Sequence, residues 1–250
     1  MTTLNRNFVL LLVAAISLLS SSCKKDDPTG PFAVVSPNAP GVTLNIEHHI
    51  DDAPLFYDTI RYTNAMGHSF SVSRLEYYLS EITLLGTNGS QNIILQGPFY
   101  INGTAGNSFD LGTLPEGEFA GATAFLGLTP AMNLTDSLPN TIENINMAWP
   151  VPMGGGYHFM KFEGHFLDNG TSTGYAMHIG RNENLPICTM PDAFTVANGG
   201  EIVLRFNLNQ VFREPNIYDL STGNYSMGSM MLMGQLRDNC SNAFNIQYRP

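Results

Sequence analysis

The chain has 250 residues, of which only 13% are charged, and its 21 acidic and 11 basic side chains give a net charge of −10. Such an acidic chain repels nucleic acid, and no basic patch reverses that repulsion, so nucleic-acid binding is excluded. The length allows one domain with a substantial core after an N-terminal segment.

The first 22 residues have the layout of a lipoprotein signal peptide. The apolar run FVLLLVAAISLL follows Arg6 and is too short to span a bilayer. Small residues then lead to Cys23, where we expect acylation, followed by a flexible linker over 23–40 that is rich in proline. This pattern predicts an outer-membrane lipoprotein of the cell envelope, periplasmic or surface-exposed, whose only membrane contact is its lipid anchor.

Alternation of apolar and polar residues dominates the expected domain over 41–250. In the segment 42–50, one face of the expected strand carries Leu44, Ile46, His48 and Ile50. Further strands are expected over 56–63, 75–86, 92–96, 119–128, 157–166, 174–180, 201–208, 229–236 and 244–248. Short strands at this spacing predict an all-β fold, an antiparallel β-sandwich with long loops. Brief helical turns are expected around 71–75 and 136–142, and a tight hairpin turn at Asp168-Asn169-Gly170.

Two cysteines remain in the expected domain, Cys188 and Cys240. In an oxidising compartment, a disulfide between them is the natural interpretation. A copper-thiolate site is the alternative.

Common catalytic motifs are missing from the sequence. It contains no GxSxG elbow, no HExxH helix, no phosphate-binding loop after a strand and no CxxCH haem site. Acidic residues such as Glu116 and Asp136 fall in expected loops, where a solvated surface explains them. We therefore expect a protein that is not an enzyme.

Six histidines and twelve methionines offer borderline and soft ligands, which favour copper over calcium or magnesium. His48 points to an apolar face, either as a ligand or as a core histidine with one hydrogen bond. His49 and His68 are expected at the surface. His158 follows a glycine triplet, and a hairpin would bring His178 near it. The methionines nearby fill apolar gaps more often than they bind metal.

The only tryptophan, Trp149, precedes two of the histidines in the stretch 147–166. A buried Trp149 close to imidazoles would indicate a metal site. An exposed Trp149 would instead form, with Tyr157, an aromatic platform for a sugar ring or a partner chain, in a glycan- or protein-binding surface lipoprotein. A purely structural envelope protein with scattered histidines is a third possibility.

Five ordered stretches resemble the MbnP family of copper-binding proteins found with methanobactin systems. They are LNIEHHIDDAPL, VSRLEYYLSEITLL, LPEGEFAGATAFLGLTPAMN, MAWPVPMGGGYHFMKFEGHF with its partner YAMHIG, and EIVLRFNLNQVF. The resemblance implies a copper-binding lipoprotein that serves in copper acquisition, storage or handling. It also implies a partner enzyme that resembles dihaem cytochrome c peroxidases.

In that family, the partner oxidises one tryptophan to kynurenine at the copper site, and Trp149 is the residue that matches. His48 and His178 match the family's histidines and are the expected copper ligands, with His158 as a third candidate. Many relatives carry a second aromatic residue where this chain has Val151, so the outline of the site differs.

Chemistry supports the need for that modification. An intact indole nitrogen has no available lone pair, whereas opening the ring of Trp149 would free an amine that can face a metal. Glu163 or Lys161 is the candidate for a hydrogen bond to one of the imidazoles.

Overall fold

The computed structural model describes residues 41–197 and 199–250. The predicted signal peptide over 1–22, the acylated Cys23 and the linker over 23–40 lie outside the described residues. Within them, no helix is both long enough and apolar enough to cross a membrane.

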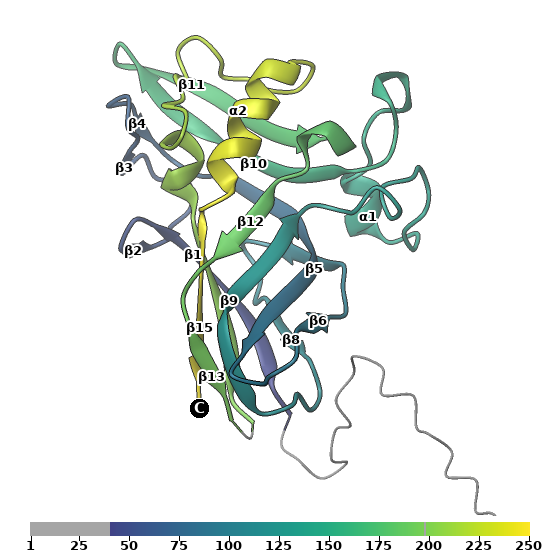
Figure 1. Ribbon diagram of the computed structural model, residues 1–250. Coiled ribbons are helices and arrows are strands. Elements are labelled where there is room, and N and C mark those ends of the chain that lie inside the picture. The colour runs from purple at the N-terminus through teal and green to yellow at the C-terminus, as the bar shows by residue number, and fades with distance from the viewer. Residues whose placement is uncertain (1–40, 198) are drawn as a thin grey trace, which may run out of the picture. The chain divides into compact units, whose positions relative to one another are not determined.

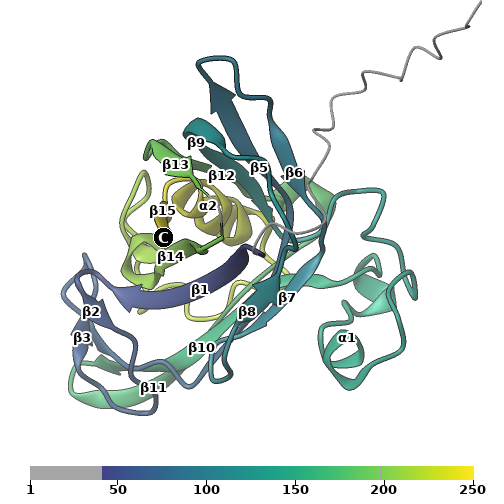
Figure 2. The same cartoon turned by 90° about the horizontal axis from the view of Figure 1, so that it is seen from below.

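Two β-sheets make up the domain (Figures 1 and 2). The five-stranded sheet contains β1 (Thr43–Ile50), β2 (Ala53–Pro54), β8 (Ser108–Asp110), β14 (Glu201–Asn207) and β15 (Phe244–Arg249). The ten-stranded sheet contains β3 (Tyr62–Thr63), β4 (Ser69–Phe70), β5 (Arg74–Thr87), β6 (Ile93–Leu95), β7 (Phe99–Asn102), β9 (Gly117–Leu126), β10 (His158–Asp168), β11 (Thr171–Gly180), β12 (Ile187–Met190) and β13 (Phe194–Val196). The predicted all-β class is confirmed. The paired strands of these sheets are antiparallel except β1 and β14, which run parallel.

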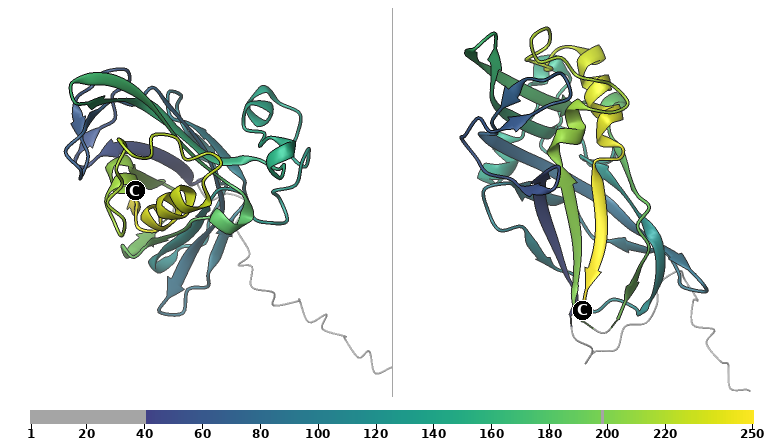
Figure 3. Two further views of the ribbon diagram at one scale, coloured as in Figure 1. Left: turned by 90° about the horizontal axis from the view of Figure 1, so that it is seen from above. Right: turned by 90° about the vertical axis from the view of Figure 1, so that its left-hand side faces the viewer.

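The helical elements are short. They are α1 (Ile142–Asn146), α2 (Met230–Cys240) and the 3-10 turns η1 (Val151–Met153), η2 (Asn182–Asn184) and η3 (Leu208–Phe212). In the view from above, α2 lies between the two sheets, whereas α1 lies outside the ten-stranded sheet (Figure 3).

The core forms where the two sheets face each other. Tyr77 of β5 packs against Phe206 of β14 and Phe244 of β15, with ring centroids 5.4 and 6.3 Å apart. Phe162 of β10 stacks on Phe212 of η3 at 5.3 Å. These rings are buried, and the removal of their apolar area from water is the main force that holds the sheets together.

The register of β10 decides which side chains face away from this core. Met160 pairs with Tyr77, so both point to the inner face. Lys161 pairs with His178 of β11 and therefore shares the opposite, outer face with it. The predicted hairpin that brings His178 to β10 is confirmed.

One predicted strand is wrong. The segment 229–236 lies mostly in the helix α2, not in a strand. Ser229 caps the helix because its side chain accepts a hydrogen bond from the backbone N–H of Leu232 at 3.3 Å. Methionine, leucine, glutamine and arginine favour helices, and this preference outweighs the short alternation that suggested a strand.

Smaller differences concern the ends of elements. The segment 56–63 contributes only β3 and an isolated bridge at Tyr57. The helical turn expected around 71–75 is instead extended chain that leads into β5, and the helix expected over 136–142 begins only at Ile142. Asp168-Asn169-Gly170 contains the expected hairpin turn, with positive φ values of 49° at Asn169 and 83° at Gly170.

The predicted disulfide is not found. Cys188 and Cys240 are free thiols, both fully buried, and the Sγ of Cys188 lies 3.3 Å from the carbonyl oxygen of Cys240. Burial raises the pKa of Cys188 to about 12 and the pKa of Cys240 well above its usual value, so both remain protonated thiols.

Candidate metal centre

Trp149 is held at the end of the β10–β11 hairpin by a short extended pairing. Its backbone N–H donates to the carbonyl of Gly156 at 2.8 Å, and the N–H of His158 donates to the carbonyl of Met147 at 2.6 Å. The side chain of Trp149 is only 2% exposed. Trp149 is thus buried, as expected of a metal site, and not exposed, as expected of an aromatic platform.

The loop between these paired segments needs its glycines. Gly154, Gly155 and Gly156 have positive φ values of 117°, 69° and 79°, a region that other residues rarely adopt. The loop returns the chain over the indole, whose Nε1 donates to the carbonyl of Met153 at 3.2 Å. The indole nitrogen is therefore already used as a donor inside the loop.

Gly180 makes room for the indole on β11. A Cβ atom at this position would lie 2.5 Å from Cε3 of Trp149, far inside van der Waals contact. The ring therefore lies directly on the backbone of Gly180, the residue that pairs with His158 across the hairpin.

His158 lies between Trp149 and His178, and these three side chains form one cluster. The ring centroid of His158 lies 4.6 Å from that of Trp149 and 5.0 Å from that of His178, and the two imidazoles are perpendicular. Its Nδ1 lies 3.1 Å from the carbonyl oxygen of Met147, which can only accept, so Nδ1 carries the proton and Nε2 keeps a lone pair. Burial, followed by the charge of Lys161, lowers the pKa of His158 to about 3 and keeps the ring neutral.

His178 has the opposite tautomer. Its Nε2 lies 2.8 Å from Oε1 of Glu163, and a carboxylate only accepts, so Nε2 carries the proton. In the neutral ring Nδ1 then keeps the lone pair, and within the described residues this buried atom has no hydrogen-bond partner. The hydroxyl of Ser226 accepts from the backbone N–H of His178 and donates to its carbonyl, both at 2.7 Å.

Glu163 is itself held as a carboxylate. The hydrogen bond from His178 lowers its pKa most, and Arg74, whose Nη1 lies 3.5 Å from its Oε1, lowers it further. The expectation that Glu163 or Lys161 would bind an imidazole thus resolves to Glu163. Lys161 instead donates to the carbonyl of Asn146 at the end of α1.

The donor set fits a soft or borderline metal. Two imidazoles, each oriented by an acceptor on one nitrogen, are the arrangement found around protein-bound transition metals. Within the described residues, no group of three or more His, Cys, Asp or Glu side chains is placed to hold a metal. A site here therefore depends on the His158 and His178 pair and on what Trp149 adds.

The structure does not bring His48 to this cluster, which corrects the pairing of His48 with His178. The Nε2 of His48 lies 2.8 Å from the hydroxyl of Tyr77, on the inner face of the ten-stranded sheet. His178 lies on the outer face, so the sheet separates the two imidazoles. Burial lowers the pKa of His48 to about 4, and its environment is that of a core histidine with one hydrogen bond. The alternation placed it on an apolar face correctly, but the structure does not bring it together with His178.

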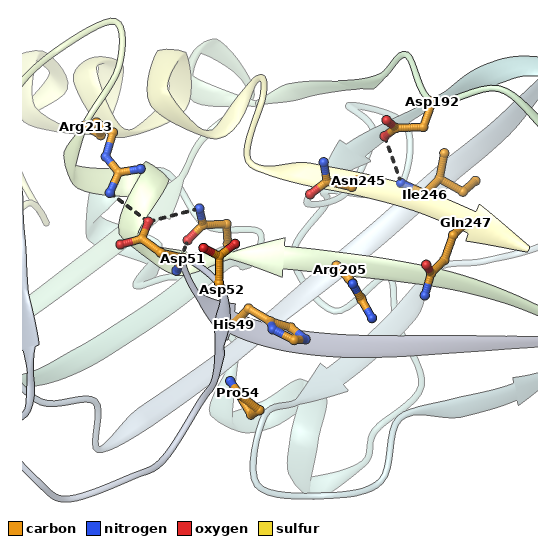
Figure 4. Close-up of a pocket in the computed structure, with 11 residues that line it drawn as sticks. His49, Asp51, Asp52, Pro54, Asp192, Arg205, Arg213, Asn245, Ile246 and Gln247 are labelled. Carbon is orange, nitrogen blue, oxygen red and sulfur yellow. Dashed lines mark hydrogen bonds and ion pairs between the residues drawn. The ribbon is translucent and has the colours of Figure 1, made fainter.

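A larger hollow lies on the five-stranded sheet, away from these residues (Figure 4). It measures about 950 Å³ and is lined by His49, Asp51, Asp52, Pro54, Asp192, Arg205, Asn207, Arg213, Asn245, Ile246 and Gln247. One ion pair joins two of these residues, with Nη2 of Arg213 2.7 Å from Oδ1 of Asp51. No Trp, Tyr or Phe lines this hollow. Trp149 and Tyr157 line a separate hollow of about 460 Å³, where their side chains are only 2% and 4% exposed, far from the open exposure expected of an aromatic platform.

Sequence patterns could not identify the groups that orient the rings. The carbonyl of Met147 and the missing side chain of Gly180 act through the backbone, so no residue type signals their role. The alternation of side chains along β10 was the one useful pattern. It places Glu163 on the same face as Lys161, the residue that pairs with His178 across the hairpin.

Comparisons with known proteins agree with this fold. The sequence model of the MbnP family matches residues 39–231. The solved structure of MbnP from Methylosinus trichosporium is similar over 85% of this chain and 99% of that chain, with a TM-score of 0.51 and 12% sequence identity, which shows a shared fold. A search of curated proteins gives no match.

Proposed function

The chain belongs to the MbnP family, and we propose that it is a copper-binding cell-envelope protein whose metal site is formed by His158, His178 and Trp149. The observation that carries this proposal is the pair of fixed tautomers. Each imidazole has an acceptor at one nitrogen, which leaves the other nitrogen, Nε2 of His158 or buried Nδ1 of His178, to offer a lone pair to a metal.

Copper suits these donors better than a hard cation does. Imidazole binds copper readily, and Cu(I) accepts few ligands, whereas calcium and magnesium need six or more oxygen atoms. The nearest carboxylate, Glu163, already accepts from His178 and so orients that ring. Bound copper would supply ligand exchange or one-electron chemistry. Since the described residues place no catalytic set beside this site, we assign the protein to copper acquisition, storage or handling.

Trp149 would become a ligand only after oxidation. Its intact nitrogen donates to Met153 and has no lone pair to offer. Two molecules of peroxide would cleave the C2–C3 bond of the indole and give N-formylkynurenine and two waters, and hydrolysis would then release formate and leave an aromatic amine. We assign the oxidation to a dihaem partner that resembles cytochrome c peroxidases.

The lipid anchor on Cys23 belongs to the same proposal. It would hold the domain at the outer membrane through the linker over 23–40, within reach of an envelope partner.

Anaerobic Cu(I) titration against a chromophoric chelator tests the site. We expect His158→Ala and His178→Ala each to lower copper affinity by more than roughly 100-fold, because even groups that only orient a ligand contribute about 10- to 100-fold. His165→Ala is the matched control, since His165 lies on the same strand but is exposed. Unchanged affinity in both site variants would refute the proposal.

A further inference from the structure

A small pocket of about 150 Å³ opens beside Trp149, near the N-terminal end of α2. It is lined by Trp149, Met153, Arg181, Gly228, Met230 and Met233. This volume holds an ion with a few waters, since a water molecule takes up about 30 Å³ in the liquid. Neither His158 nor His178 lines it, so the pocket is separate from the imidazole pair.

Two of the three thioethers converge on one point. Nδ2 of Asn184 lies 3.6 Å from Sδ of Met230 and 3.9 Å from Sδ of Met233. The two methionines are three residues apart on α2, which places them on the same face of the helix. Asn184 is only 1% exposed, and the carbonyl of Gly180 holds its amide at 3.2 Å.

The third thioether reaches the pocket from the loop that covers Trp149. Met153 ends η1, and its Cε lies 3.9 Å from where a Cβ of Gly228 would be. Gly228 and Met153 therefore lie side by side in the wall of the pocket. The three sulfur-bearing side chains come from two separate segments and meet only in the folded chain.

Gap filling does not explain this group of methionines. Methionine as a core filler is buried, as Met233 is at 1% exposure. Met230 is 41% exposed and Met153 is half-buried, so their thioethers face an open pocket rather than the packed interior.

The pocket has the chemistry of a soft-cation site. Thioether sulfur selects Cu(I) among biological metals, whereas hard cations need oxygen donors. The pocket has no carboxylate in its lining. The cation in the wall, Arg181, is partly exposed, and its Nη2 lies 3.6 Å from Oε1 of Glu183, so solvent and that carboxylate reduce its repulsion.

We propose that Met153, Met230 and Met233 form a second site for a soft monovalent cation, with Cu(I) as the biological ligand. The inference rests on the proposed function only for the identity of that metal. Trp149 borders this pocket and also contacts His158, so one aromatic ring adjoins both sites.

Titration with Ag(I), a redox-inert stand-in for Cu(I), tests the second site in the full chain. Native mass spectrometry counts the bound ions, and fluorescence reports on Trp149, the only tryptophan. We expect two equivalents in the wild type and one in a variant with Met153→Leu, Met230→Leu and Met233→Leu, a change that conserves volume. Met231→Leu is the matched control, because Met231 lies on α2 but is 70% exposed and outside the pocket.

A single substitution guards against the possibility that the triple variant does not fold. Met153→Leu alone changes a short turn, and we expect it to weaken the second equivalent by more than about tenfold. Retention of both equivalents by the triple variant would overturn the inference. The inference would also be overturned if the wild type bound only one equivalent and the double variant His158→Ala, His178→Ala bound none. That result would leave the proposed function intact. A single equivalent lost only in the leucine variants would support the methionine site and contradict the histidine site.

Discussion

The imidazole rings of His158 and His178 meet edge to face, with their centroids 5.0 Å apart, and each is oriented by a different acceptor. A backbone carbonyl fixes His158, and a carboxylate fixes His178. Because these acceptors determine which nitrogen carries the proton, the two lone pairs available to a metal are set before any metal binds.

Glu163 is expected to tune the site without binding the metal. Replacement by glutamine keeps the shape but removes the charge that orients His178, so copper affinity should fall by roughly 10- to 100-fold. A chelator-competition titration measures this loss. Glu76→Gln is the control, because Glu76 shares the outer face and pairs with Arg74 but does not contact His178. Equal effects of the two substitutions would contradict the assigned role.

His48 is expected to matter for stability and not for copper. Replacement by leucine leaves the buried hydroxyl of Tyr77 without its partner, which should lower the free energy of unfolding by about 1–3 kcal/mol. Urea unfolding measures the change, and copper affinity should stay at the wild-type value. A loss of copper binding in a folded His48→Leu protein would show that His48 belongs to the metal site after all.

Gly180 is expected to set the position of the indole. A methyl group at this position would overlap Trp149, so Gly180→Ala should displace the ring and lower stability by about 1–3 kcal/mol. The shift should appear as a red-shifted fluorescence maximum. Gly174→Ala on the same strand is the control, because its Cβ would lie 3.6 Å from the hydroxyl of Tyr225, an ordinary contact. An unchanged spectrum in Gly180→Ala would contradict the packing described here.

The sequence was a good guide to the strands and a partial one to the site. The expected hairpin placed His178 beside β10, alternation placed His48 on an apolar face, and both placements are correct. Alternation cannot say which sheet covers a face, and this is why His48 was grouped with a histidine on the other side of the sheet.

Helix α2 shows a second limit. Its methionines suit a helix by intrinsic preference, and the cap at Ser229 supplies its start, but the short apolar alternation over 229–236 suggested a strand. The group of Met153, Met230 and Met233 was therefore not foreseen, since it exists only once α2 packs near the loop over Trp149.

The two buried cysteines give a prediction about reactivity. Both side chains are fully buried as free thiols, so Cys188 and Cys240 should resist alkylation in the native protein and react once it is unfolded without reductant. Peptide mapping by mass spectrometry separates them from Cys23. A disulfide-linked peptide containing both residues would contradict the free-thiol state.

The proposed oxidation of Trp149 predicts a change confined to one peptide. Protein isolated with the dihaem partner should carry kynurenine at position 149, with one oxygen atom gained and one carbon atom lost. Mass spectrometry of the fragment containing 147–166 measures this, and a Trp149→Phe variant is the control. Unmodified tryptophan in protein produced with an active partner would contradict the proposal.

Diffraction at the copper absorption edge tests the central claim most directly. Crystals of copper-loaded protein should show an anomalous peak within bonding distance, about 2 Å, of Nε2 of His158 and Nδ1 of His178. Loss of that peak in His178→Ala crystals would complete the assignment. A strongest peak at His48, or on the five-stranded sheet with the two imidazoles free, would contradict it.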